Sequence, residues 1–521
     1  MAIDHPTAWP LGDWVHRQAD RHGERNALTF RGETLSYAAF AGRIDRFVHG
    51  LVQQLDLKPG DRIAYIGRNH PDLLALVFAA ARLSLIVVPI NWRLAPPEHQ
   101  TILADAEPAA LIAEEAFAER FEAFAANGMS SRLIASDFSK QGWLPIDELL
   151  SSGGDHVNPF GGANPTGGAS SALLIVYTSG TTGLAKGAVL TQDAVRWNAA
   201  NSVDMHRITG ADRILSALPL FHVGGLNIQT LPAFAMGAEV LLEAHFDPGE
   251  ALEIIVESKP AHTVLVPAMM RALIGHPAFE GADLSSLRQI ATGSSLVPTA
   301  LIQVFHDRNI PVTQVYGTTE TAPIAVYQRV DDAFSTIGSA GKVGKHGEMR
   351  VISEDGKVAE VGVPGEIQIR GPQVMSGYWN NASATDEAFH EDWFRTGDIG
   401  RLDDGGNLFV EARKDDLIKS GSERIYPAEI EAVLSAVSDV DEVIVVGRTD
   451  PIWGEVPVAV VQLAAGAKID AETLLQSLNG RIARYKWPKE VRFVEAMPRS
   501  ALGKVLRYRL RAALMKADDG S

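Results

Sequence analysis

Short runs of apolar residues alternate with helical patterns through most of the chain. Residues 62–66, 85–90 and 172–177 have the length and apolar content of buried strands, whereas residues 71–83 have the pattern of a buried helix. The same pattern predicts further strands at 239–243, 263–266 and 312–316. Strands that alternate with helices indicate an α/β fold with largely parallel sheets covered by helices. Ligands of such sheets bind where loops leave the carboxyl ends of the strands.

The pattern changes after Pro364. Residues 365–370 (GEIQIR) and 406–412 (GNLFVEA) are predicted to be short strands next to tight turns. We therefore expect a β-rich subdomain at the end of the large domain. The highly charged segment 413–419 follows it.

A new α/β pattern begins after this charged segment, with strands predicted at 440–446 and 456–463. We place a domain boundary at Asp415, which divides a large N-terminal domain over 1–414 from a small α+β domain over 415–521. More than one domain is expected because a chain of 521 residues exceeds what a single hydrophobic core usually organises.

Composition excludes several kinds of partner and site. The chain has 47 Lys and Arg against 64 Asp and Glu, a formal net charge of −17. Such a chain repels polyanions, so neither nucleic acid nor anionic lipid is an expected partner. The absence of cysteine excludes disulfides, Cys-ligated zinc, iron–sulfur clusters and a cysteine nucleophile, and it fits a cytoplasmic location.

No targeting or membrane segment is expected. Residues 1–14 lack the basic start and apolar run of a secretory signal. The most apolar stretch, 73–90, is interrupted by Arg82, so a buried helix followed by a buried strand explains it better than a membrane span.

Residues 177–187 (YTSGTTGLAKG) form the first candidate for a binding site and follow a predicted strand. Glycines let backbone N–H groups turn inward around an anion, hydroxyls donate further hydrogen bonds, and a lysine adds positive charge. The segment differs from a Walker P-loop, because Lys186 is followed by Gly187 instead of Ser or Thr. A plain surface loop is the alternative, which the ordered placement after a strand disfavours. The candidate phosphate ligands are Thr178, Ser179, Gly180, Thr181, Thr182, Gly183 and Lys186.

Further segments rich in Gly, Thr and charged residues follow in the chain. Taken one at a time, they have ordinary explanations: a core histidine, a solvated glutamate, a solvated charge cluster, or a lysine in a basic terminal helix. The segments are 218–225 (LPLFHVGG), 291–298 (ATGSSLVP), 316–320 (YGTTE), 395–400 (RTGDIG), 411–416 (EARKDD) and 498–507 (PRSALGKVLR).

Together with residues 177–187, these segments resemble the motifs of the adenylate-forming superfamily. That superfamily contains acyl-CoA synthetases, aryl-CoA ligases, luciferases and peptide-synthetase adenylation domains. The motifs stand in the family's order, and the resemblance covers nearly the whole chain. It implies a large domain that binds ATP and an acid, and a small mobile lid domain that turns about a hinge at Asp415. Ala185 departs from the pattern, since proline is usual there.

The resemblance also implies a nucleotide site. Tyr316 would pack on adenine, Thr319 would contact the α-phosphate, and Glu320 would hold Mg²⁺ together with Thr182. Asp398 and Arg413 would bind the ribose, and a carboxylate can accept hydrogen bonds from both ribose hydroxyls. The remaining candidates around the nucleotide are Gly293, Ser294, Ser295, Gly317 and Thr318.

The acid would lie beside the aromatic–histidine pair of residues 218–225, with His222 near its carboxylate. Amino-acid activators place an aspartate at the position of His222 to pair the substrate's ammonium, and an unpaired ammonium would be costly there. The resemblance therefore favours a carboxylic acid without an amino group, either a medium-chain fatty acid or an aryl acid. The candidate pocket residues are Phe221, His222, Val223, Gly224, Asn227 and Thr292.

The lid would supply the catalytic lysine, Lys504, and part of the thiol site. Ser420, Gly421 and Trp453 are the candidate contacts of coenzyme A, although simple packing is an equal alternative for Trp453. Ser422 and Arg424 depart from the family's pattern in this loop. Within residues 481–516, eleven basic residues stand against two acidic ones, as expected for a cationic lid that meets polyanions; a solvated basic helix is the alternative.

The implied reaction has two steps. The carboxylic acid attacks the α-phosphate of ATP to give an acyl-adenylate, and the thiol of coenzyme A then replaces AMP. The chain is thus expected to be an acid–CoA ligase that uses ATP, Mg²⁺ and coenzyme A, and a homodimer is possible because homodimers are common among soluble proteins. An enzyme that loads a separate carrier protein and a non-catalytic nucleotide- or acyl-binding protein are the alternatives. Nothing in the motifs favours a luciferase-like oxidation.

Overall fold

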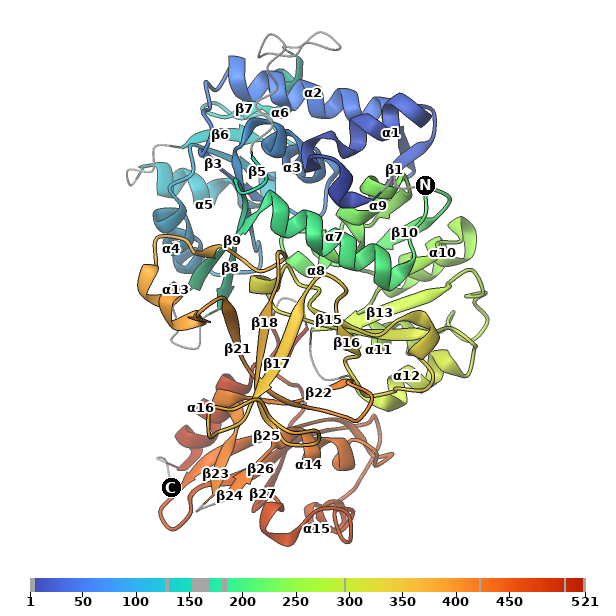
Figure 1. The fold of residues 1–521 in the computed structure, drawn as a ribbon, viewed down its shortest axis with the longest axis vertical. Helices are drawn as coiled ribbons and strands as arrows, with labels where there is room; N and C mark the ends of the chain where they lie inside the picture. The colour runs from blue at the N-terminus through green and yellow to red at the C-terminus, as the bar shows by residue number, and fades with distance from the viewer. Residues whose placement is uncertain are drawn as a thin grey trace.

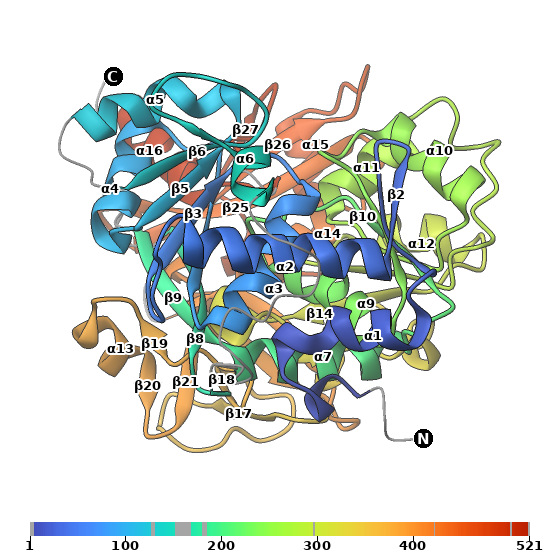
Figure 2. The ribbon, with the colours of Figure 1, turned by 90° about the horizontal axis from the view of Figure 1, so that it is seen from above.

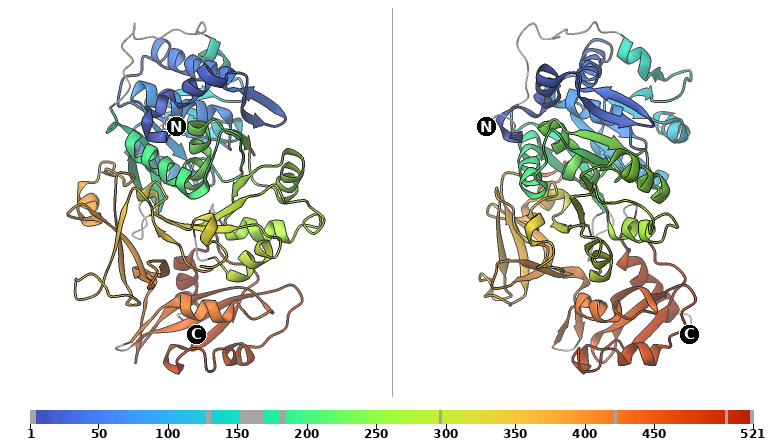
Figure 3. Two further views of the ribbon diagram at one scale, coloured as in Figure 1. Left: turned by 45° about the vertical axis from the view of Figure 1, so that its right-hand side comes forward. Right: turned by 90° about the vertical axis from the view of Figure 1, so that its right-hand side faces the viewer.

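The computed structural model describes residues 5–126, 131–151, 168–179, 185–294, 297–420, 423–500 and 503–518. A large domain occupies the upper part of Figure 1, and a small C-terminal domain lies below it, beside a β-rich subdomain (Figures 1 and 3). The α/β prediction is confirmed, because helices cover the mixed, largely parallel sheets of the large domain.

One sheet of the large domain has the strand order β16-β15-β14-β13-β12-β10-β11-β1-β2. Its strands from β14 to β1 run parallel, and the strands at both edges are antiparallel. Three of these strands were expected, at β11, β12 and β14. The bounds are β1 Asn26–Phe30, β2 Glu33–Ser36, β10 Arg213–Ser216, β11 Glu239–Leu242, β12 His262–Val264, β13 Gln289–Gly293, β14 Val312–Tyr316, β15 Val326–Tyr327 and β16 Lys342–Val343.

The second sheet has the order β19-β9-β8-β4-β3-β5-β6-β7. Strands β8 and β9 are antiparallel, with Thr178 opposite Lys186, so the candidate phosphate loop connects the two strands of a hairpin. The bounds are β3 Arg62–Ile66, β4 Ile86–Ile90, β5 Ala110–Ala113, β6 Arg132–Ala135, β7 Leu144–Pro145, β8 Ala172–Ser179, β9 Ala185–Thr191 and β19 Gly377–Tyr378.

Helix α3 (Pro71–Leu83) packs between the two sheets, and α2 (Tyr37–Gln53) lies across it (Figure 2). Every residue of α3 except Arg82 is buried, which confirms the predicted buried helix. No helix among the described residues is long and apolar enough to cross a membrane. The other helices are α1 Trp14–His22, α4 Pro96–Ala106, α5 Glu115–Ala126, α6 Ile146–Ser151, α7 Gln192–His206, α9 Leu231–Met236, α10 Pro248–Ser258, α11 Pro267–Ile274 and α12 Thr299–His306.

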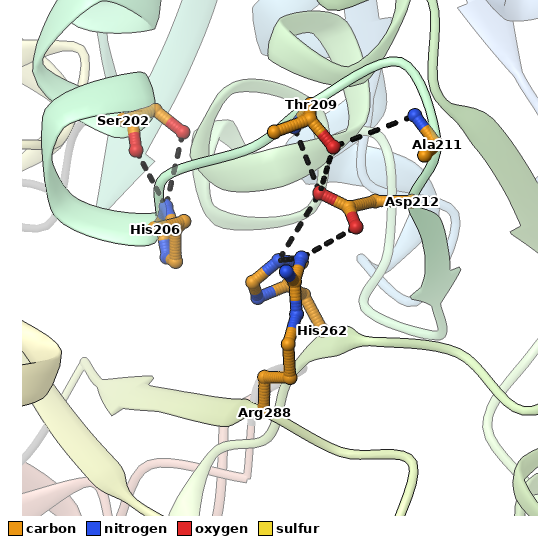
Figure 4. A network of polar contacts seen from close by, with 7 residues as sticks. All are labelled: Ser202, His206, Thr209, Ala211, Asp212, His262 and Arg288. Atoms are coloured by element: carbon orange, nitrogen blue, oxygen red, sulfur yellow. Dashed lines mark hydrogen bonds and ion pairs between the residues drawn. The ribbon is translucent and has the colours of Figure 1, made fainter.

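A largely buried group of polar residues lies at the amino ends of β10, β12 and β13, next to α7 (Figure 4). The side chain of Arg288 donates to Asp212 and lies 3.0 Å from Nε2 of His262. Burial and the neighbouring His262 lower the pKa of His206 to about 3, so this imidazole is neutral. This group of residues lies at the sheet edge opposite to the carboxyl ends, and we assign it a structural role.

The β-rich subdomain is an antiparallel sheet with the order β17-β18-β21-β20, and β22 pairs with β21. Strand β22 begins two residues later than expected, because Gly406 belongs to a turn and has a φ of +75°. The bounds are β17 Glu348–Ile352, β18 Gly365–Arg370, α13 Ala382–Ala388, β20 Phe389–His390, β21 Trp393–Leu402 and β22 Leu408–Arg413.

The C-terminal domain is α+β, as predicted, and its core strands β25 and β26 form a long hairpin. The proposed boundary residue Asp415 lies in a single 3₁₀ turn, Lys414–Asp416, between β22 and β23. Residues 481–516 do not form one basic helix: that alternative is wrong, because a 3₁₀ turn, β27 and a loop precede α16. The bounds are β23 Ile418–Ser420, β24 Glu423–Ile425, α14 Pro427–Leu434, β25 Val440–Asp450, β26 Gly454–Leu463, α15 Ala471–Gln476, β27 Glu490–Phe493 and α16 Arg507–Asp518.

Candidate active site

The described ends of the predicted phosphate loop belong to β8 and β9. The Oγ1 atom of Thr178 donates to the carbonyl of Lys186 across this hairpin, at 3.4 Å. The side-chain nitrogen of Lys186 lies 5.3 Å from the ring centre of Tyr378, a cation–π contact. Strand β19, which carries Tyr378, pairs with β9. Outside the described residues lie Gly180, Thr181, Thr182, Gly183 and the side chain of Ser179.

The segment that follows β14 turns sharply at Gly317. A Cβ atom at this position would lie 1.7 Å from the carbonyl oxygen of Pro323, so only glycine fits. The N–H of Thr318 donates to Oγ1 of Thr321, at 2.9 Å, while Oγ1 of Thr318 is buried without a hydrogen-bond partner among the described residues. Thr319 and Glu320 come next, in a 3₁₀ turn, and both are buried.

Glu320 has the features of a single protein ligand to a metal–nucleotide complex. The hydroxyl of Tyr378 donates to Oε1 of Glu320 at 2.8 Å, and Oε2 accepts no hydrogen bond from the described residues. Magnesium often binds one or two carboxylates and takes its other ligands from phosphates and water. The described part of the chain contains no cluster of three metal-ligating side chains.

The sequence analysis did not single out Tyr378, although it touches both Lys186 and Glu320. Its hydroxyl is acidic only at very high pH, because burial and the adjacent Glu320 raise the pKa of Tyr378. The tyrosine therefore stays a hydrogen-bond donor. In the sequence, only the preceding Gly377 marks Tyr378 as a candidate functional residue, and this signal is weak. The pairing of β19 with β9 is what brings Tyr378 to Lys186.

The proposed ribose ligands face each other across two paired strands. Asp398 of β21 lies opposite Arg413 of β22, and Oδ1 of Asp398 is 2.8 Å from Nε of Arg413. The hydroxyl of Tyr316 donates to Oδ2 of Asp398, also at 2.8 Å. Burial raises the pKa of Asp398, against the opposite effect of Arg413 and Tyr316. Each carboxylate oxygen of Asp398 keeps a lone pair for a ribose hydroxyl. The hydrogen bond from Tyr316 also fixes the tyrosine ring, which is expected to pack on adenine.

The predicted adenine loop starts where β13 ends. A Cβ atom at Gly293 would lie 2.4 Å from the carbonyl oxygen of Val315, so this backbone packs closely on β14. Ser294 has a φ of +72°, a left-handed conformation that glycine adopts more easily. Ser295 lies outside the described residues. Thr292 is fully buried, with its hydroxyl 3.6 Å from the sulfur of Met270.

His222 precedes the one-turn helix α8 (Val223–Gly225), with Phe221 and Val223 buried on either side. Its Nδ1 atom accepts a hydrogen bond from the N–H of Gly224, at 2.9 Å, so the ring proton is on Nε2. Burial and the charge of Lys504 lower the pKa of His222 to about 4. At neutral pH the imidazole is therefore an uncharged donor through Nε2.

Asn227 is held by protein contacts. It lies in the π-helical turn Leu226–Thr230, and its Nδ2 atom donates to the carbonyl of Ala322 at 3.1 Å. Its Oδ1 atom is buried without a partner among the described residues. One N–H of the amide therefore stabilises the loop after Glu320, and the contact of Asn227 with the acid stays a prediction.

Lys504 reaches the site from the C-terminal domain. It lies in the loop before α16 and is exposed. Desolvation by the surrounding protein and the charge of Arg413 lower the pKa of Lys504, while Asp398 acts in the opposite direction. The ammonium is thus close to the proposed ribose site and to His222, although more than a hundred residues separate Lys504 from Asp398.

A cavity of about 240 Å³ adjoins the Lys504 loop. None of the predicted acid-pocket residues lines it, and residues just before His222 do so instead. Sequence reasoning missed this cavity, since its walls come from segments far apart in the chain. The walls include Trp92, Arg93, Leu218, Pro219, Phe246, Met269 and Gly503.

The proposed contacts of coenzyme A lie together on another edge of the C-terminal domain. Ser420 of β23 pairs with Gly454, the residue after Trp453. Trp453 is about half exposed at the tip of the β25–β26 hairpin, where its N–H donates to Oδ1 of Asp450 at 2.9 Å. In Figure 1, β23 and β24 lie at the bottom of the molecule, away from the large domain. Gly421, Ser422 and the side chain of Arg424 are outside the described residues.

A buried carboxyl group, Glu243, follows β11 next to two residues that line the cavity, Ala244 and His245. Both of its oxygens lack hydrogen-bond partners among the described residues, and the side chain is almost fully buried. Burial, with the nearby Glu250 and Asp247, raises the pKa of Glu243 to about 8. At neutral pH the group is therefore mainly protonated.

Replacing Glu243 with glutamine is expected to stabilise the protein at pH 8.5 by about 4 kcal/mol and to have little effect at pH 5. In the unfolded chain this carboxyl ionises near its ordinary pKa of 4.5, so the free energy of unfolding falls as the pH rises from about 4.5 to about 8. Urea unfolding of both proteins between pH 5 and pH 9 measures the difference. A parallel pH dependence in the variant and the parent would contradict the assignment.

Comparison with known proteins identifies the family of this chain. The sequence pattern described as "AMP-binding enzyme" matches residues 15–379, and the pattern of the "AMP-binding enzyme C-terminal domain" matches residues 429–504. The chain is 46% identical to indoleacetate–CoA ligase of Aromatoleum aromaticum, over 95% of this chain and 96% of that protein. It is 38% identical to feruloyl-CoA synthase of an Amycolatopsis species, over 96% and 98%.

A solved structure is similar as well. The o-succinylbenzoate CoA synthetase of Bacillus subtilis, in complex with its acyl-adenylate intermediate, superposes with a TM-score of 0.83 at 30% identity. The similarity covers 96% of this chain and 98% of that one.

Proposed function

This chain belongs to the AMP-binding enzyme family and is an AMP-forming acid–CoA ligase, and we propose that its substrate is an aryl-substituted carboxylic acid. The reaction proceeds through an acyl-adenylate, so the site has to serve two steps in turn. The proximity of Lys504, from the C-terminal domain, to His222 and Asp398 of the large domain is the observation that carries the proposed residue roles.

In the first step, the acid carboxylate attacks the α-phosphate of ATP and pyrophosphate leaves. Negative charge gathers where two anions meet, so donors that are already oriented lower the barrier most. We assign Lys504 to the developing charge between carboxylate and α-phosphate, and the Nε2–H of His222 to the carboxylate. Thr319 would donate to the α-phosphate, and Lys186 to the outer phosphates.

The nucleotide would be oriented by Asp398 and Arg413 at the ribose and by Tyr316 at the base. A magnesium ion held by Glu320 and the phosphates would neutralise charge on ATP. Tyr378 would keep Glu320 in place, because its hydroxyl already bonds one oxygen of that carboxylate.

In the second step, the thiol of coenzyme A attacks the acyl carbon and AMP leaves. We propose that the thiol arrives through the cavity beside Gly503, whose walls include Trp92 and Met269. The lid would first turn about Asp415, which removes Lys504 and brings Ser420 and Trp453 toward the site. In the present arrangement of the lid, β23 and β24 lie away from the large domain (Figure 1), which supports the need for that rotation.

The proposal of an aryl acid rests on the pocket and on the relatives. A Cβ atom at Gly224 would lie 3.1 Å from Nδ1 of His222, so glycine here keeps a larger side chain from crowding the imidazole beside the proposed acid site. The relatives named for indoleacetate and ferulate share more of their sequence with this chain than the long-chain fatty-acid ligase does, at 46% and 38% against 35%.

An acid panel tests the proposal. With ATP and coenzyme A, we expect indoleacetate, phenylacetate or ferulate to give a kcat/KM at least about tenfold above that of decanoate, measured as AMP release. A preference for decanoate would contradict the aryl assignment. Activity with a pantetheinylated carrier protein but none with free coenzyme A would instead favour the carrier-loading alternative.

Two further features complete the proposal. We place the enzyme in the cytoplasm, where ATP and coenzyme A are both available. We also propose a homodimer, a common state for enzymes, which light scattering of the purified protein tests.

A further inference from the structure

Helix α11 of the large domain faces two acidic residues of the lid. The Nη2 atom of Arg271 lies 3.9 Å from Oε1 of Glu442, and Nε lies 4.0 Å from Oδ1 of Asp441. Both carboxylates belong to β25. The side chain of Arg271 is 22% exposed, so water screens these contacts only in part.

Glu442 connects this contact to the lysine loop. Its carboxylate also binds Arg499, with 2.5 Å between Nη2 and Oε2. The Nη1 atom of Arg499 donates to the carbonyl of Gly503 at 2.9 Å, and Gly503 directly precedes Lys504. A continuous set of charged contacts therefore runs from α11 to the residue before the proposed catalytic lysine.

The lysine loop also rests on α11 itself. Gly503 has a φ of +75°, and a Cβ atom there would lie 2.9 Å from Cβ of Ala268. Ala268 stands three residues before Arg271, so the two share one face of the helix. The small side chain of Ala268 lets the loop approach the helix. Arg271, on the same face, contacts Glu442 of β25, and Glu442 binds Arg499 of the lysine loop.

We propose that Arg271 is a positioning residue that favours the lid arrangement in which Lys504 faces the nucleotide site. The inference rests on the proposed function, because it assumes that each half-reaction uses a different arrangement of the lid. Glu442 and Arg499 both belong to the lid and move together, whereas their contact with Arg271 joins the two domains. Rotation of the lid breaks that contact, so Arg271 stabilises the adenylating arrangement alone.

The test separates the half-reactions. Arg271→Glu is expected to lower acid-dependent ATP–pyrophosphate exchange by about tenfold, because it places like charges opposite each other, and Arg271→Ala by about threefold. Conversion of supplied acyl-adenylate to acyl-CoA should stay within about twofold of the parent in both variants. Combining Arg271→Glu with Asp441→Arg should restore exchange, since Asp441 is partly exposed on the lid.

A matched control is Arg31→Glu, which makes the same charge change in the exposed turn between β1 and β2. It should alter neither half-reaction. Equal loss of both half-reactions in Arg271→Glu, unchanged exchange, or no recovery in the charge-swapped pair would overturn the proposal. Failure of the proposed function is distinct, because the unaltered protein would then release no AMP with any acid.

Discussion

Replacing Lys504 with alanine is expected to slow acyl-adenylate formation by about a thousandfold and to leave thioester formation from supplied acyl-adenylate nearly unchanged. The ammonium lies close to Asp398 and His222, where it can balance the charge that builds up as carboxylate meets α-phosphate. The second step releases AMP after the lid has turned, so it does not need this charge. ATP–pyrophosphate exchange measures the first step, and acyl-CoA formation from synthetic acyl-adenylate measures the second.

Lys468→Ala is the matched control, since it removes the charge of an exposed lysine on the same domain. It should leave both half-reactions intact. If Lys504→Ala slowed both half-reactions equally, the lysine would serve the fold or the whole nucleotide site, and its assignment to the first step would be wrong.

Replacing Asp415 with proline is expected to preserve adenylation and to slow thioester formation by about a hundredfold. Asp415 lies in a 3₁₀ turn, whose φ is close to the angle that proline requires, so the present lid arrangement tolerates the ring. Rotation of the lid needs a change of backbone angles at this turn, and the ring restricts one of them. The same two half-reaction assays measure the effect.

Asp404→Pro provides a control in another exposed turn. The N–H of Gly406 donates to the carbonyl of Asp403, so Asp404 takes the second position of a β-turn, where proline is favoured. This variant should retain both activities. Normal thioester formation in Asp415→Pro would mean that the lid turns about another residue.

The sequence alone determined the local elements and the set of candidate residues. The apolar runs at 62–66 and 312–316 coincide with β3 and β14, because a buried strand needs only a short contiguous pattern. Strand ends were less well predicted where a turn intervenes, as at Gly406. Motifs such as residues 316–320 can be recognised in the sequence for the same reason, because their functional side chains belong to a few consecutive residues.

Only the tertiary structure decided how these segments meet. Arg413 binds Asp398 through strand pairing, Tyr378 reaches Glu320 and Lys186 through the pairing of β19 with β9, and neither contact has a signature in sequence spacing. The neutral state of His222 likewise follows from burial and from Lys504, which belongs to another domain. Local patterns predict the secondary structure and the candidate residues of a segment. Distances and pKa values depend instead on packing between residues that are far apart in the chain.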